Sequence, residues 1–70
     1  MTPTIGRIVL WHGEVSNGAV EHPAIITRVW SDTCVNLTVF PDFSAPSLKS
    51  SQVQDEETTQ AVGWRWPPRV

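Results

Sequence analysis

The alternation of apolar and polar side chains over residues 34–40 limits the fold more than any other feature of the chain. Valine or leucine occupies every second position in the middle of this segment, and asparagine and threonine stand between them. Because successive side chains of a β-strand point to opposite faces of its sheet, this period of two predicts a half-buried antiparallel strand. The residues predicted to face the core are Val35, Leu37 and Val39.

Four other segments are typical of strands. Residues 5–11 and 23–30 are rich in β-branched and aromatic side chains, and the second of these is predicted to form a hairpin with residues 34–40. Residues 48–53 predict a more polar strand. A short strand over residues 64–66 ends the series, because the two prolines that follow lack the N–H that a sheet ladder requires.

Turn-forming residues separate these segments. Asn17-Gly18 predicts that residues 14–22 form a long loop or a small hairpin, and residues 41–47, with two prolines and two serines, predict a connection. The acidic run at residues 55–57 precedes residues 58–60, where one helical turn has room to form.

This element order predicts a single all-β domain over residues 1–70. Five short strands with few helix signals favour a small five-stranded SH3-like barrel or two packed antiparallel sheets. A four-stranded open sheet with one helical turn is the competing architecture.

The composition excludes several classes of protein. A chain of 70 residues builds one thin core, which leaves little room for a large catalytic cleft. A net charge of −2 argues against duplex DNA as a partner. The single cysteine, Cys34, has no thiol with which to form an intramolecular disulfide. Without a signal-peptide pattern or an apolar run of about 18 residues, we expect a soluble cytoplasmic protein with no membrane partner.

Tryptophan and arginine gather near the C-terminus. In an extended segment Trp64 and Trp66 leave one face while Arg65 points to the other. We expect at least one indole of this pair to close the core, and exposed indoles to bind a ligand with help from guanidinium groups. The candidate ligand-binding residues are Trp64, Arg65, Trp66, Arg69, Arg28, Trp30, Trp11 and His12.

Residues suited to catalysis or metal binding are sparse. Cys34 with His12 or His22 is the only thiol and imidazole combination, but Cys34 begins an ordinary alternating strand, which favours a small buried hydrophobe. His12 and His22 flank a polar loop without a known zinc spacing, so we expect them to be solvated loop residues. The acids at residues 55–57 are typical of a solvated surface. We therefore predict no catalytic residue, no metal ligand, no cofactor and no enzymatic activity.

Three segments resemble short proteins of tailed phages and prophages, and the Trp-x-Trp-Pro ending is the distinctive one. The segments are residues 5–9, 24–30 and 64–69. The resemblance implies a small, non-enzymatic phage accessory protein that acts in the cytoplasm of the bacterial host, and it transfers no catalytic residues to this chain.

Two classes of function remain. In the first, the protein sequesters a small nucleotide-like ligand, such as a nucleotide-derived host immune signal, between aromatic rings and arginines at an interface of a homo-oligomer. In the second, the same surface binds a host or virion protein through Trp and Arg hot spots, as SH3-like domains bind peptides. A structural role in the virion is a third. Apolar residues on both sides of residues 23–30 fit a dimer and a closed barrel equally.

Overall fold

The computed structural model describes residues 1–13, 21–42 and 44–68 of the chain. Within these ranges the backbone forms strands and no helix. They therefore contain no helical segment that could cross a membrane. The strands are β1 (Ile8–His12), β2 (Glu21–Val29), β3 (Cys34–Val39), β4 (Ser47–Val53) and β5 (Gly63–Arg65).

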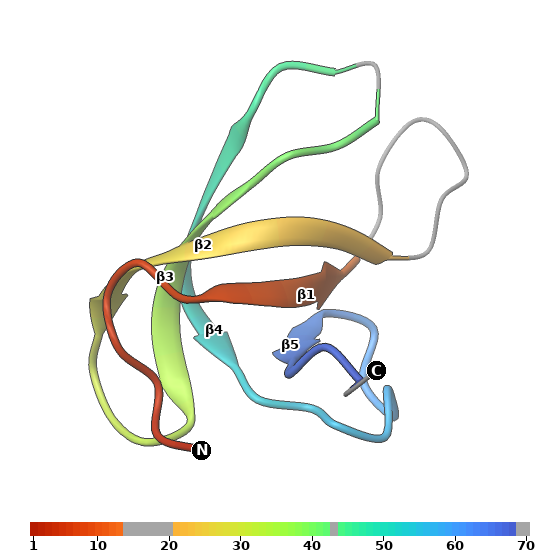
Figure 1. The fold of residues 1–70 in the computed structure, drawn as a ribbon. Coiled ribbons are helices and arrows are strands. Elements are labelled where there is room, and N and C mark those ends of the chain that lie inside the picture. The colour runs from red at the N-terminus through yellow and green to blue at the C-terminus, as the bar shows by residue number, and fades with distance from the viewer. Residues whose placement is uncertain (14–20, 43, 69–70) are drawn as a thin grey trace.

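The strands form one five-stranded antiparallel sheet in the order β4-β3-β2-β1-β5. The sheet curls into a half-barrel, and Figure 1 shows β1 and β2 side by side with β3 and β4 turning away from them. The chain after β4 returns to β5 through a parallel bridge between Gln54 and Trp64. Beside this bridge the Asp55 N–H donates to the Trp64 carbonyl at 2.7 Å. The predicted all-β class, with five strands, is confirmed.

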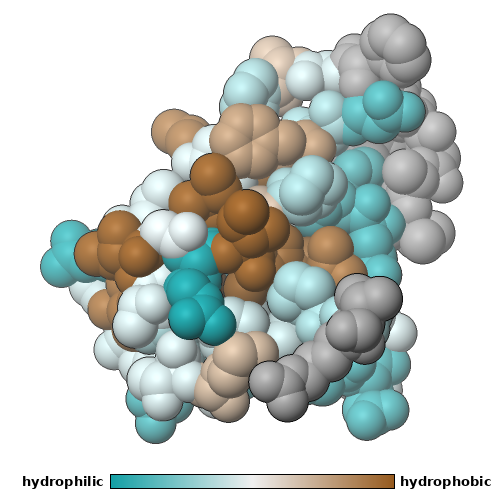
Figure 2. Space-filling model, in the orientation of Figure 1, coloured by the Kyte–Doolittle hydropathy of each residue, from teal (hydrophilic) through white to brown (hydrophobic). Residues whose placement is uncertain are grey.

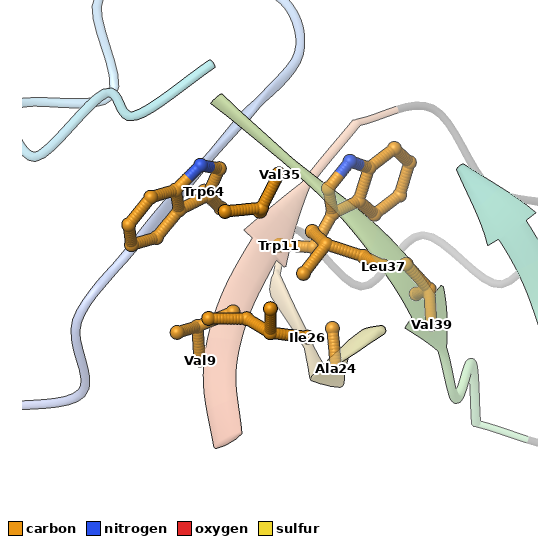
Figure 3. Packing of buried hydrophobic residues seen from close by; sticks show 8 residues of the cluster. All are labelled: Val9, Trp11, Ala24, Ile26, Val35, Leu37, Val39 and Trp64. Carbon is orange, nitrogen blue, oxygen red and sulfur yellow. The ribbon is translucent and has the colours of Figure 1, made fainter. Parts of the chain in front are cut away.

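Side chains from β1, β2, β3 and β5 meet in one core on the inner side of the curled sheet, as Figure 3 shows. The core residues are Val9, Trp11, Ala24, Ile26, Val35, Leu37, Val39 and Trp64. Every second residue of β3 is among them, which confirms the core face predicted from its alternation.

β4 contributes no member to this buried core, and that accounts for its polar sequence. Its inward side chains cover Trp11 instead. The Trp11 indole N–H donates to Gln52 Oε1 at 2.8 Å, and Lys49 Nζ lies 5.1 Å from the centre of the Trp11 ring. Lys49 stands opposite Leu37 and Gln52 opposite Val35, so both lie on the core side of the sheet.

The first strand is shorter than predicted. It begins at Ile8 and not at residue 5, because the chain before it makes a turn in which the Arg7 N–H donates to the Thr4 carbonyl at 3.2 Å. Gly6 lies in this turn with a φ of 94°, a conformation that a residue without Cβ adopts at little cost.

The segment between β4 and β5 forms turns, and the helical turn expected at residues 58–60 is absent from it. Thr58 has a φ of 52°, and its N–H donates to the Asp55 carbonyl at 3.1 Å. The competing four-stranded sheet with a helical turn is therefore wrong. The loop or hairpin predicted for residues 14–22 lies outside the described residues, apart from Glu21 and His22, which belong to β2.

Candidate functional site

Two of the tryptophans proposed for ligand binding belong to the core. Trp11 and Trp64 are both buried, and each indole N–H has protein acceptors. The Trp64 N–H lies 3.2 Å from the carbonyl oxygens of both Thr33 and Gln52, so this indole ties β5 to the β2–β3 turn and to β4. The expectation that one indole of the C-terminal pair closes the core is confirmed.

Trp66 is half-buried at the edge of this core. Its ring meets the Trp64 ring edge-to-face, with centroids 5.4 Å apart and an interplanar angle of 85°. The guanidinium carbon of Arg7 lies 5.6 Å from the centre of the Trp66 ring. The Trp66 backbone N–H donates to Glu56 Oε2 at 3.0 Å, so the ring and the backbone of this residue both have partners within the protein. Arg69 lies outside the described residues.

Arg65 forms an ion pair with Glu21 across β1. Its Nε and Nη2 donate to the two carboxylate oxygens of Glu21 at 2.6 and 2.8 Å. The paired hydrogen bond to Arg65 holds the pKa of Glu21 below its ordinary value, and Glu21 in turn raises the pKa of Arg65. Alternation places Arg65 on the face opposite Trp64 and Trp66. The C-terminal residues proposed as one site are therefore divided between two faces.

Arg28 and Trp30 form a separate pair at the end of β2. The guanidinium carbon of Arg28 lies 4.0 Å from the centre of the Trp30 ring, a cation–π geometry, and the Trp30 side chain is 52% exposed. The Trp30 indole N–H donates to Asn36 Oδ1 at 2.8 Å. The indole orientation is thus fixed while much of its surface remains accessible to a partner.

Two β-bulges lie next to Asn36 and shape the surface beside Arg28 and Trp30. The register between β2 and β3 shifts between Ile26 and Arg28, and the register between β3 and β4 shifts where Ser51 has a φ of 53°. Asn36 Oδ1 also accepts a hydrogen bond of 2.8 Å from the Ser51 N–H, so one side chain links Trp30 to the bulge of β4. A shallow hollow of about 250 Å³ lies here, lined by Thr27, Asn36, Leu37, Leu48, Lys49 and Ser50.

Apolar side chains form rows across the side of the sheet that faces away from the core. In one row Ile8 stands opposite Ile25, Ile25 opposite Thr38, and Thr38 opposite Leu48, so the row spans four strands. Ile8 is 59% exposed and Leu48 is 82% exposed. We call this surface the outer face; it comprises Ile8, Leu10, Pro23, Ile25, Thr38, Phe40 and Leu48.

Figure 2 shows hydrophobic side chains gathered over β1 and β2 in the middle of the outer face. A large apolar patch on a soluble protein marks a site that another molecule covers, because leaving it in water has a free-energy cost. The sequence predicted apolar residues on both sides of β2, and on the side that faces away from the core Ile25 is only half-buried.

His12 and Asp55 form a buried contact that the sequence did not predict. His12 Nε2 lies 3.0 Å from Asp55 Oδ2, and because a carboxylate only accepts, Nε2 carries the hydrogen. Oδ1 of Asp55 accepts hydrogen bonds from the N–H and hydroxyl of Thr59, and Oδ2 accepts one from the Gln60 N–H. The expectations of a solvated His12 and a solvated Asp55 were wrong, since both are buried.

The position of Gly63 depends on this contact. A Cβ there would lie 2.8 Å from Asp55 Cβ and 3.0 Å from the Val53 carbonyl oxygen, so glycine lets β5 approach the Asp55 turn. His22, also expected to be solvated, is buried with its ring centroid 6.1 Å from that of Trp11. Cys34, expected to be buried, is half-buried.

The His12–Asp55 contact does not extend into a nucleophilic site. His12 Nδ1 is buried and has no hydrogen-bond partner, so no hydroxyl or thiol of the described residues is aligned for deprotonation by this ring. Within the same part of the chain there is no cluster of three His, Cys, Asp or Glu side chains suited to a metal ion. The contact instead holds the turn after β4 against β1.

Acidification is expected to destabilise the fold through Asp55 and Glu21. The Gln60 N–H, with Thr59 and His12, holds the pKa of Asp55 below its ordinary value, although burial acts in the opposite direction. A carboxyl group with a depressed pKa in the folded protein stabilises it above the pKa of the unfolded chain, and this stabilisation is lost as the pH falls through the folded pKa. Urea denaturation should therefore show stability falling below about pH 4.

The matched variant for this measurement is Asp55→Asn, which should be less stable than the wild type at pH 7 and show a weaker dependence on pH in the acidic range. Equal pH dependence in the two proteins would show that Asp55 does not carry the effect.

Comparisons with protein-family models, with curated proteins and with solved structures found no match to this chain.

Proposed function

We propose that this protein is a non-enzymatic interaction module that binds a partner protein through its outer face. The observation that carries the proposal is the row that crosses four strands through Ile8, Ile25, Thr38 and Leu48. It is apolar except for Thr38, and Leu48 at its end is 82% exposed. Complete burial of one such leucine or isoleucine side chain stabilises a complex by roughly 1.5 to 3 kcal/mol. Arg28 and Trp30, residue types enriched in interaction hot spots, lie at the C-terminal end of β2.

Sequestration of a nucleotide-like ligand fits the geometry less well. Phosphate groups need several converging cations, whereas Arg65 is held by Glu21 and Arg7 lies over Trp66. Trp11 and Trp64 have no free ring faces on which a base could stack, because both are buried.

The setting of this interaction follows from the resemblance to short phage proteins. We place the protein in the cytoplasm of a bacterial host, where the partner is a host protein or a component of the virion. A sheet face without cover is compatible with either partner.

The test compares Leu48→Ser with Val62→Ser, a matched control that removes an apolar side chain 46% exposed in the turn before β5. Both proteins should fold as the wild type does. A partner recovered with the wild-type protein from host lysate or phage particles is purified, and its dissociation constants for the three proteins are measured by calorimetry. We expect Leu48→Ser to weaken binding about tenfold, which corresponds to about 1.4 kcal/mol, and Val62→Ser to leave it unchanged.

Equal affinities for wild type and Leu48→Ser would remove the outer face from the interaction. A loss of the same size in Val62→Ser would place the binding surface at the turn before β5.

A further inference from the structure

We propose that the segment bound by the outer face presents a carboxylate next to an apolar side chain, and that Arg28 receives this carboxylate. The inference rests on the proposed function and names the chemistry of the partner.

Arg28 is held in place before any partner binds. Its guanidinium group lies 4.0 Å from the centre of the Trp30 ring, and Trp30 is fixed by its hydrogen bond to Asn36. Asn36 is fixed in turn by the Ser51 N–H. A guanidinium group that lies over an indole keeps the N–H groups at its edge free to donate in the guanidinium plane. A carboxylate accepts hydrogen bonds in this geometry.

Among the described residues, no salt bridge joins Arg28 to a carboxylate. The two ion pairs in this part of the chain are Arg65 with Glu21 and His12 with Asp55, and neither involves Arg28. An exposed cation held by stacking, without an internal counter-ion, is complementary to an acid supplied by another molecule.

The hollow beside Arg28 is rich in hydrogen-bond donors. Thr27, which precedes Arg28, and Ser50 line it and carry hydroxyl groups, whereas the Lys49 ammonium lies on the core side over the Trp11 ring. Leu48 lines the same hollow and also ends the apolar row. The surface thus offers donors and an apolar side chain together, which matches a segment with an acidic residue beside a hydrophobic one.

A second copy of this chain does not satisfy this requirement. The carboxylate on the outer side of β2, Glu21, already accepts two hydrogen bonds from Arg65. Two outer faces packed together would leave the Arg28 of each copy without the Glu21 carboxylate as a partner, and a buried charge without a partner is unfavourable. A nucleic acid also fits poorly, because a chain with net charge −2 repels a polyanion and a phosphate backbone offers no aliphatic group for Leu48.

The test uses two labelled twelve-residue peptides in which leucine alternates with glutamate in one and with glutamine in the other. Binding is measured by fluorescence anisotropy for the wild type, Arg28→Gln and Leu48→Ser, at low and high salt. We expect the wild type to prefer the glutamate peptide about tenfold, and this preference to fall as salt screens the charges. Arg28→Gln should bind both peptides equally, and Leu48→Ser should weaken both to the same extent.

The outcomes separate this inference from the function on which it rests. Equal binding of both peptides by the wild type, with Leu48→Ser still weakening both, would overturn the carboxylate preference and leave the outer face as an interaction surface. Leu48→Ser without effect on either peptide, or no binding of either by the wild type, would overturn both. Tighter binding of a single-stranded oligonucleotide, abolished in Arg28→Gln, would replace the carboxylate with phosphate.

Discussion

Replacement of Trp64 by alanine is expected to lower the free energy of unfolding by about 3 to 5 kcal/mol. The side chain is fully buried, and its indole N–H reaches two carbonyl oxygens that belong to the β2–β3 turn and to β4. Truncation would leave a large cavity and remove the contact with the Trp66 ring. A domain of this length is stable by only about 4 to 10 kcal/mol, so this loss removes a large part of the free energy of unfolding.

The measurement is urea denaturation followed by circular dichroism, with Trp30→Ala as the control. Trp30 is the tryptophan at the β2–β3 turn with half of its surface exposed, so its removal should cost far less than that of Trp64. A Trp64→Ala protein as stable as Trp30→Ala would show that β5 does not hold the barrel closed.

The second large effect is expected for Leu37→Ala, with a loss of about 2 to 5 kcal/mol. Leu37 lies in the centre of β3 and its side chain is buried among the core residues of β1 and β2. Leu48→Ala removes the same atoms from the outer face of the neighbouring strand, where they are exposed. That variant should remain within about 0.5 kcal/mol of the wild type.

This comparison also separates stability from binding. If Leu48 has no structural role, a binding defect of a Leu48 variant reflects lost contact with the partner and not unfolding. Equal losses of stability at both positions would mean that the outer face is packed against part of the chain.

The strands were predictable because each has a local pattern. The alternation in β3 gave its core face, and the prolines after Trp66 explain why β5 is short. The start of β1 was less predictable, because the turn at Gly6 depends on a hydrogen bond of its N–H to the Ile26 carbonyl, far along the sequence. The polar character of β4 became understandable only when Trp11 was placed against it.

The polar contacts were not predictable, because their partners are distant in sequence. His12 and Asp55 are 43 residues apart, and Glu21 and Arg65 are 44 residues apart. Neither pair leaves a local spacing that could be recognised. Alternation alone did predict that Arg65 leaves the face of the two C-terminal tryptophans, although all three were expected to serve one binding site.

The outer face required the strand register before it could be recognised. Ile8 and Leu48 lie in segments far apart in the sequence, and they share one row only because Ile25 and Thr38 stand between them. Leu48 was the one local indication of the outer face, because it is an apolar residue in a polar strand. An exposed apolar side chain that does not face the core often belongs to a binding surface.

The most direct test of the central claim, that the outer face is the recognition surface, is the dissociation constant of Leu48→Ser for the purified partner beside that of Val62→Ser. The account predicts about tenfold weaker binding for Leu48→Ser, unchanged binding for Val62→Ser, and thermal stability close to that of the wild type in both. Wild-type affinity in a folded Leu48→Ser protein would contradict it.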